Sequence, residues 1–200
     1  MTPLQNSLRA WLPYLFIGAG LIGLFASFEL TLQSMKVLND PNYIPPCNIS
    51  PFISCSAVMD SWQSTLFGFP NSLLGVIGFP IIVTIGFSLL AGAQFKRWFR
   101  LGAQLGLTVA VAFVYWFFYQ SVFVTNSLCP WCLVFWSVTI PLFWYTTLFN
   151  LQEGNLRLST YADGIKAFAL KNPHIPLLVL YGIIVATILI RYWPYWSTLF

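Results

Sequence analysis

Five long runs of apolar residues constrain this chain more than any other feature of its sequence. They cover about residues 11–32, 70–93, 101–124, 129–148 and 175–192. A helix rises about 1.5 Å per residue, so about 20 residues cross the roughly 30 Å apolar core of a bilayer. Only 7% of the 200 residues are charged, whereas a soluble domain carries about a quarter charged residues. The sequence therefore predicts an all-α integral membrane protein with five spanning helices.

The basic residues predict how these helices cross the membrane. With five crossings, the N-terminal tail and the second and fourth connections share one side. Seven of the nine basic residues lie in these three segments: Arg9, Lys96, Arg97, Arg100, Arg157, Lys166 and Lys171. Because positively charged segments stay in the cytoplasm, we expect a multi-pass protein of the cell (inner) membrane with a cytoplasmic N-terminus. So few charges exclude a nucleic-acid partner.

Two segments between the apolar runs have patterns of their own. Residues 33–69, on the expected extracytoplasmic face, are rich in Pro, Asn and Ser, and they end in an apolar run, 62–69. That run could lie on the membrane surface as a short helix. The connector 151–174, on the expected cytoplasmic face, carries an amphipathic pattern and is assigned no chemistry. The apolar residues of this pattern are Leu158, Tyr161, Ile165 and Phe168.

All four cysteines fall on the expected extracytoplasmic face, where disulfides form and persist. Cys47 and Cys55 lie in the long loop, and Cys129 and Cys132 open the fourth apolar run as a C-P-W-C motif. Proline suits a first helical turn, and the positive end of the helix dipole lowers the pKa of a thiol placed there. A C-x-x-C pair closes almost no loop, so it gains little as a structural disulfide. The motif therefore favours a redox-active pair, with the four cysteines as the catalytic candidates.

Other interpretations of the cysteines stay open at this point. Cys47 and Cys55 could form a purely structural disulfide within the loop, and all four thiolates could form a closed zinc site. The outward location and the lack of a nearby histidine argue against zinc, so no metal is expected. The only histidine, His174, lies on the cytoplasmic side, which also removes a Cys/His hydrolase. Two pairs on one face also allow a relay from a soluble partner to an electron carrier in the membrane.

At this point the residues resemble the vitamin K epoxide reductase family. The shared pattern is a loop Cys-x7-Cys, a serine six residues after the second cysteine, Ser61, and a C-x-x-C at the head of the fourth span. The run F-G-F-P-N-S-L-L-G over residues 67–75 also fits. Other quinone-linked disulfide generators carry the two kinds of pair in the opposite order. The resemblance covers about residues 10–150.

The resemblance implies a division of the chain. A four-helix bundle, residues 1–150, would surround a quinone (ubiquinone or menaquinone), and its outer loop 33–69 would carry the wide pair. The connector 151–174 would lead to a fifth transmembrane helix and short tail, 175–200, packed outside. Many bacterial relatives carry a fused thioredoxin-like domain after the fifth span. This chain ends at Phe200, so a thioredoxin-fold partner is expected to be separate or removed.

The resemblance also implies a role for each cysteine. Cys47 would exchange with the thioredoxin-fold disulfide carrier, and Cys55 would carry the electrons to Cys129. Cys132, the deeper cysteine, would face the quinone ring.

Three further residues are candidates for holding the quinone. Asn71 resembles the amide that hydrogen-bonds a quinone carbonyl in the family, although a helix cap after Pro70 is an equally weighted alternative. Ser61 is the serine of the shared pattern. Trp136 stands where some members place a tyrosine that donates to the quinone, and this departure puts epoxide reduction in doubt more than quinone reduction.

The sequence thus predicts an enzyme, a quinone-dependent membrane thiol–disulfide oxidoreductase that reoxidises a thioredoxin-fold partner and supports disulfide bond formation. Within the family, the alternative is a quinone or vitamin K epoxide reductase whose relevant product is the quinol. From another class, the chain could be a small transporter or scaffold with structural disulfides. Against a transporter, no intramembrane charge marks a path, since Glu29 falls near the outer end of the first span.

Overall fold

The computed structural model of the protein describes residues 3–40, 42–50, 52–156 and 163–197. Five of its helices are long and apolar enough to cross a membrane: α1 (Pro3–Asn39), α3 (Ser72–Leu90), α4 (Arg97–Tyr119), α5 (Pro130–Gln152) and α7 (His174–Arg191). The chain continues from α4 as a π-helix, η2 (Gln120–Val124). The shorter helices are α2 (Cys55–Met59), η1 (Trp62–Thr65), α6 (Asp163–Lys171) and α8 (Trp193–Trp196). The described residues form no strand, and the predicted all-α membrane fold is confirmed.

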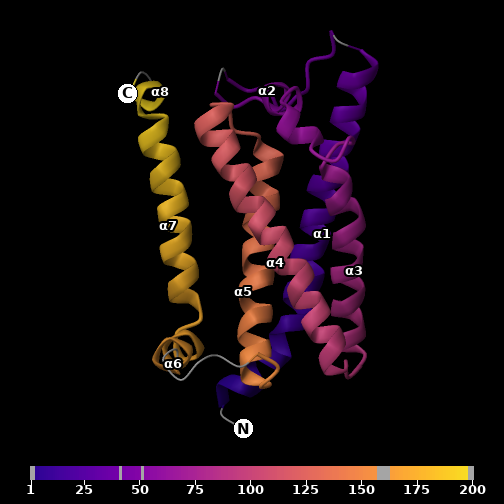
Figure 1. Cartoon of the computed structure of the whole chain (residues 1–200), viewed down its shortest axis with the longest axis vertical. Coiled ribbons are helices and arrows are strands. Elements are labelled where there is room, and N and C mark those ends of the chain that lie inside the picture. The colour runs from indigo at the N-terminus through magenta and orange to yellow at the C-terminus, as the bar shows by residue number, and fades with distance from the viewer. Residues whose placement is uncertain (1–2, 41, 51, 157–162, 198–200) are drawn as a thin grey trace.

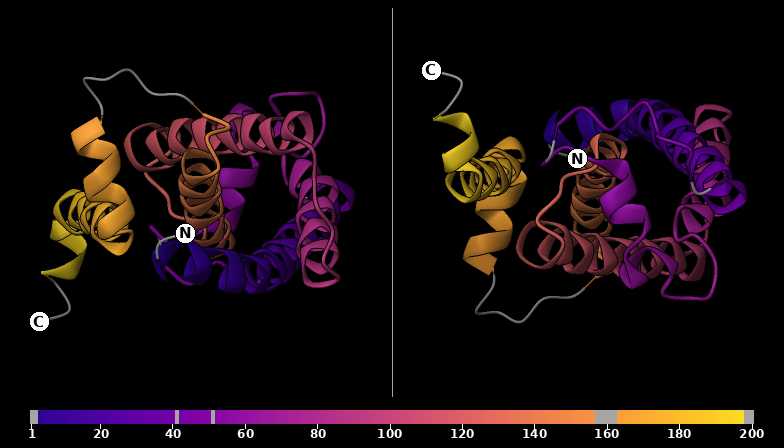
Figure 2. Two further views of the ribbon diagram at one scale, coloured as in Figure 1. Left: turned by 90° about the horizontal axis from the view of Figure 1, so that it is seen from below. Right: turned by 90° about the horizontal axis from the view of Figure 1, so that it is seen from above.

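Four of the long helices form one bundle, and α7 stands beside it (Figures 1 and 2). Helix α1 packs against both α3 and α5, and α4 packs against α5. The contact between α1 and α3 depends on glycines, because side chains of the facing helix occupy the space next to them. A Cβ at Gly23 would lie 2.2 Å from the ring of Phe79, and one at Gly75 would lie 2.2 Å from Ser27 Oγ.

The bundle has two large buried clusters, one toward each end. One lies along α1, α3, α4 and α5 and includes Phe16, Phe79 and Leu107. The other contains all four cysteines together with residues such as Val114 and Trp136. We call the end of the bundle that holds the second cluster the cysteine end. Many apolar side chains on the outside of the helices are exposed, as expected where lipid is the solvent.

The opposite end of the bundle is held by polar side chains that bond one another. The Asn155 amide donates to Asn150 (3.0 Å), the Asn150 amide donates to Gln104 (3.1 Å), and the Gln104 amide donates to Thr147 (2.8 Å). Buried amides are costly unless they are paired in this way. The chain of amides therefore fastens α4 to the end of α5.

An ion-pair cluster lies at the same end. Glu153 accepts hydrogen bonds from Arg9 and from Arg100, the latter at 3.0 Å. Burial acts to raise the pKa of the Glu153 carboxyl, but the two arginines outweigh it and hold that pKa below its ordinary value. This cluster of three residues joins the starts of α1 and α4 to the end of α5.

Two expectations about helix extent differ from the structure. The first spanning helix was expected over residues 11–32 but runs from Pro3 to Asn39, because an apolar run marks only the lipid-embedded part of a longer helix. The run 62–69 forms the single 3-10 turn η1 and then leaves the helical path. It does so at Gly68, which has φ +81°, just ahead of Pro70.

The loop and the connector also contain features beyond the predictions. The segment between α1 and α3, which carries Cys47 and Cys55, is here called the cysteine loop. Its short helix α2 was not predicted. In the connector, Leu158 and Tyr161 lie outside the described residues, while Ile165 and Phe168 are both exposed on α6. Helix α6 instead buries Ala169, and the two described residues of the predicted apolar face, Ile165 and Phe168, do not pack against the bundle.

Candidate active site

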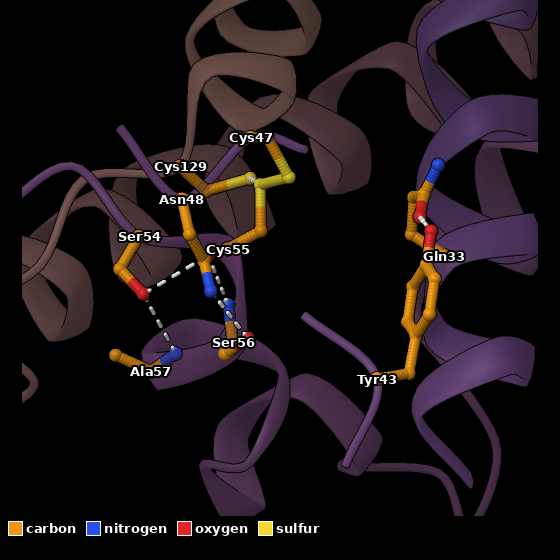
Figure 3. The surroundings of a disulfide bond; sticks show 9 residues. All are labelled: Gln33, Tyr43, Cys47, Asn48, Ser54, Cys55, Ser56, Ala57 and Cys129. Carbon is orange, nitrogen blue, oxygen red and sulfur yellow. Dashed lines mark hydrogen bonds between the residues drawn. A yellow bond between two sulfur atoms is a disulfide. The ribbon is translucent and has the colours of Figure 1, made fainter. Parts of the chain in front are cut away.

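The disulfide of the loop meets Cys129 of the C-x-x-C pair at the cysteine end of the bundle (Figure 3). Cys47 and Cys55 form a disulfide with an S–S distance of 1.98 Å, and Cys129 and Cys132 are free thiols. The Sγ atom of Cys129 lies 3.4 Å from the Sγ of Cys55. Cys55 is 0% exposed and Cys129 is 1% exposed. A thiol in contact with one sulfur of a disulfide, shielded from water, is arranged for thiol–disulfide exchange.

Backbone hydrogen bonds bring these two sulfurs together. The Leu128 N–H donates to the Phe52 carbonyl at 2.8 Å, and the Ser54 N–H donates to the Leu128 carbonyl at 3.0 Å. Ile53 and Leu128 therefore form a parallel bridge, although they are far apart in sequence. Since Cys55 follows Ser54 and Cys129 follows Leu128, this short pairing fixes the contact between the two cysteines.

Asn48 fastens the loop around the disulfide (Figure 3). Its Nδ2 donates to Ser56 Oγ at 2.8 Å, while its Oδ1 accepts from the Ser56 N–H and from Ser54 Oγ, both at 3.1 Å. Ser54 also caps α2 by accepting from the Ala57 N–H at 3.3 Å. Sequence reasoning missed Asn48. Its position beside a cysteine and within reach of two serines was the available signal.

Cys129 is the N-cap residue of α5, and Pro130 occupies the first turn of that helix. A hydrogen bond from the Cys132 thiol is the main cause that lowers the pKa of Cys129. Burial opposes it, and the N–H groups of Cys132 and Trp131 lower the pKa further. The direction is the one expected for a thiol at a helix N-terminus, and it favours the thiolate that both attacks and leaves in exchange reactions.

Cys132 lines a cavity of about 60 Å³ whose wall residues come from all four bundle helices and from the loop that carries Cys47 and Cys55. Two residues predicted to bind the quinone, Asn71 and Trp136, also line it. Trp136 is buried and contacts Phe118 edge to face at 5.2 Å. Lining residues that sequence reasoning missed include Ser34, Val58, Met59, Ser64, Ser72, Phe117 and Phe135.

Asn71 presents one atom without a partner. Its Nδ2 donates to the Gln63 carbonyl at 2.5 Å, and its Oδ1 is buried with no hydrogen-bond partner. The side chain does not cap α3, although Asn71 stands at the N-cap position. A buried acceptor at a cavity wall suits a ligand that carries a donor.

Ser61 does not line this cavity. Its Oγ donates to the Val58 carbonyl at 2.6 Å, and its own carbonyl accepts from Ser64 Oγ at 2.8 Å. Ser61 precedes η1 and shapes the chain between α2 and that turn. The structure therefore brings Asn71 and Trp136 to Cys132 but leaves Ser61 outside the lining.

A second cavity of about 610 Å³ continues from the first between α3 and α4. The two share Asn71, Phe113 and Phe135 as lining residues. The walls of the second cavity are apolar, and small residues along them, including Gly102 and Gly106, leave the space open. Ile81 and Val109 line this cleft and are exposed on the lipid-facing surface. The pair of cavities thus suits a ligand with a compact polar ring and a long apolar tail.

The side chains that could bind a metal ion do not gather at the cysteines in the part of the chain that the structure describes. Within the described ranges, no group of three or more His, Cys, Asp or Glu side chains is placed to hold a metal ion. His174 lies at the other end of the bundle, where its Nδ1 is 2.7 Å from the Tyr145 hydroxyl. The arrangement of the site is therefore one of thiols, one disulfide and an apolar cavity.

Comparison with known proteins identifies the family to which the chain belongs. The sequence model of the vitamin K epoxide reductase family matches residues 14–147, which include all four cysteines and most of the bundle. No curated protein matches the chain. The family implies disulfide and quinone redox chemistry in the membrane, and its members are oxidoreductases. The match covers more than half of the sequence, so the chain belongs to the vitamin K epoxide reductase family.

Proposed function

We propose that the protein reoxidises a separate thioredoxin-fold disulfide carrier on the extracytoplasmic face of the cell membrane and passes two electrons to a membrane quinone, ubiquinone or menaquinone. The observation that carries this proposal is the 3.4 Å contact between Cys55 and Cys129. Cys132, in the first turn of the same helix, lines the adjoining cavity. The sulfurs thus form a continuous path from the loop to the cavity.

The first step takes electrons from the partner. One thiolate of the partner's dithiol attacks Cys47, the Cys47–Cys55 bond breaks, and Cys55 leaves as a thiolate. The second partner thiol, after losing its proton, attacks the mixed disulfide and releases Cys47. The partner leaves as a disulfide, and the loop pair is reduced.

The second step moves the electrons across the contact. The Cys55 thiolate attacks Cys129 of an oxidised Cys129–Cys132 pair, that bond breaks, and Cys132 leaves as a thiolate. Cys47 then attacks Cys55 and releases Cys129. The loop disulfide is restored and the C-x-x-C pair is reduced, which is the combination of bonds described above. The lowered pKa of Cys129 assists its release.

The cavity at Cys132 fits a quinone by the chemistry of its walls. Asn71 and Trp136 would hold the polar ring, and the apolar cleft between α3 and α4 would hold the tail. A bound quinone supplies an acceptor for two electrons and two protons. Because Asn71 directs Nδ2 to Gln63, its unpartnered Oδ1 would accept a hydrogen bond from a quinol hydroxyl. The family amide was expected to donate to a carbonyl, so this orientation instead favours the reduced ligand.

The test uses the purified chain in lipid with a reduced thioredoxin-fold protein and a soluble ubiquinone analogue. Cys132→Ala should abolish quinone reduction while Cys47 still exchanges with the partner. In a Cys55→Ala variant, the Cys47 thiolate should attack the disulfide of the oxidised partner, which gives a mixed disulfide on Cys47 and one free partner thiol. Quinone-dependent oxidation that survives in Cys132→Ala would refute the proposed exit of electrons.

A separate test is needed to decide which product matters in the cell, the disulfide of the partner or the quinol. The same contact serves an enzyme whose relevant product is the quinol. Loss of disulfides from secreted proteins in cells that lack the chain would support disulfide generation. Normal secreted disulfides together with a depleted quinol pool would support the reductase instead.

A further inference from the structure

The outer end of the fifth helix contacts the cysteine loop. Helix α7 buries none of its own residues, and it stands beside the bundle for most of its length (Figure 1). At the cysteine end, however, Tyr192 is only 2% exposed. It belongs to a buried apolar cluster, here called the loop clamp, whose members come from the loop, α4, η2, the start of α5 with the segment before it, and the end of α7. The buried members are Phe52, Val122, Leu128 and Tyr192, and Ile53, Phe118, Leu133 and Ile188 pack against them.

Aromatic rings form the centre of the loop clamp. Phe52, which lies between Cys47 and Cys55 in the chain, is 8% exposed. Its ring centre is 5.7 Å from that of Tyr192 and 4.8 Å from that of Tyr195. The Tyr192 hydroxyl is buried and has no partner, so the ring supplies the contact.

A polar contact next to these rings holds the second cysteine segment. Arg191 donates a hydrogen bond to the Asn126 side chain. Asn126 lies three residues before Cys129 and has a positive φ of +52°, so its backbone turns sharply into the segment that leads to α5. The end of α7 therefore contacts both chain segments that meet at the reactive sulfurs.

The loop clamp is joined directly to the thiol contact. The carbonyl of Phe52 accepts from the Leu128 N–H at 2.8 Å, so the residue packed on Tyr192 is also bonded to the residue before Cys129. During turnover the Cys47–Cys55 bond opens, and the loop loses its covalent closure. We propose that Tyr192 and Phe52 are positioning residues that keep Cys55 against Cys129 while the loop disulfide is open. This inference rests on the proposed function, because only a relay requires the contact to survive that opening.

The test measures how well the two thiols are held together. In a Cys47→Ala/Cys132→Ala background, Cys55 and Cys129 are the only thiols, and oxidised glutathione converts them to a disulfide while two reduced glutathiones form. The equilibrium constant gives the effective concentration of one thiol at the other. Tyr192→Ala should lower this effective concentration about tenfold, equivalent to about 1.4 kcal/mol. Phe52→Ala should lower it to a similar extent.

Three control variants separate positioning from docking of the fifth helix. Tyr192→Phe retains the ring and should restore the parent value. Tyr181→Phe removes a hydrogen bond from α7 to the Ser137 carbonyl (2.8 Å) outside the loop clamp and should leave the value unchanged. Trp193→Ala removes an exposed neighbouring ring and should also leave it unchanged.

The outcomes are distinct from those of the proposed function, because the glutathione equilibrium involves neither quinone nor partner. An effective concentration within twofold of the parent in both Tyr192→Ala and Phe52→Ala would overturn the proposed positioning role of these two residues, even in a protein with full quinone reductase activity. An equal loss in Tyr181→Phe would also overturn it, since the effect would then belong to helix docking. Phe52→Leu, which retains apolar volume, provides the measurement if an alanine variant does not fold.

Discussion

At the cysteine end of the bundle, buried polar atoms stand without partners, whereas at the opposite end the buried amides bond one another in a chain. The unpartnered atoms among the described side chains are Ser27 Oγ, Asn71 Oδ1 and Tyr192 Oη, and all three lie in the half that holds the cysteines. Gln104, Asn150 and Asn155 are instead paired. Unpaired buried groups cost stability, so they mark places where a fold is shaped for something other than stability.

The same contrast holds for the strongest links at each end. Glu153 keeps two arginine partners, and nothing in the proposed reaction changes them. At the cysteine end, by contrast, the proposed reaction breaks and remakes the bond between Cys47 and Cys55 in every cycle. The end at Glu153 therefore keeps the same contacts throughout the proposed cycle. The cysteine end must keep its geometry even while the Cys47–Cys55 bond is open. Substitutions at the two ends should separate activity from stability.

Replacement of Cys129 by serine should give the largest effect on activity. Because Cys129 is the sulfur that would receive electrons from Cys55 in the proposed relay, we expect Cys129→Ser to reduce quinone-dependent turnover by at least roughly a thousandfold. Its thermal unfolding should match that of the parent, since no structural bond is lost. Quinone reduction with the thioredoxin-fold partner measures the first quantity. Turnover near the parent value would show that the contact with Cys55 is not part of the electron path.

Replacement of Asn150 should give the reverse result. Asn150→Ala leaves the facing groups of Gln104 and Asn155 unpaired, which should destabilise the protein by about 1–3 kcal/mol. Thermal or denaturant unfolding in detergent measures the loss, and turnover of the remaining folded protein should be unchanged. Asn42→Ala is the matched control, because Asn42 is exposed and the change should stay within about 0.5 kcal/mol.

Replacement of Asn48 should weaken closure of the loop pair. With only Cys47 and Cys55 present, Asn48→Ala should lower the equilibrium constant for their disulfide against glutathione about tenfold, because three hydrogen bonds across the loop are lost. Asn42→Ala again serves as control in the same loop. A constant equal to the parent's would mean that the backbone alone holds the loop.

Replacement of Glu153 should have the smallest effect on the stability of the protein. Its partner Arg9 is partly exposed, so Glu153→Gln should cost at most about 1 kcal/mol at neutral pH. Because the folded pKa of Glu153 lies below its unfolded value, the pair stabilises the protein above the unfolded pKa, and this contribution is lost as pH falls through the folded pKa. The melting temperatures of parent and variant should therefore converge in acid. A difference in melting temperature that stays constant as the pH is lowered would show that the substitution acts through packing and not through charge.

The features that were predictable from the sequence are those determined locally. Apolar runs showed the five spans, and Pro130 beside Cys129 showed where α5 begins. The extension of α1 to Asn39 was not predictable from hydropathy, because residues outside the lipid need not be apolar to be helical.

The rest of the site depends on contacts between distant segments. The bridge between Ile53 and Leu128 and the ring contact between Phe52 and Tyr192 leave no periodic signal in either segment. The contact of Cys55 with Cys129 was reached through family resemblance, not through spacing. The resemblance also included Ser61 among the quinone-binding residues, whereas its hydroxyl bonds to the Val58 carbonyl outside the cavity lining.

The cleft between α3 and α4 has a consequence for how the ligand arrives. Its walls include Ile81 and Val109, which face the lipid, so an apolar molecule can enter sideways from the bilayer without passing through water. The supply is then a two-dimensional pool, and the relevant measure is the number of ligand molecules per lipid. Turnover in vesicles should fall when the membrane is diluted with extra phospholipid and should stay constant when the same vesicles are diluted with buffer.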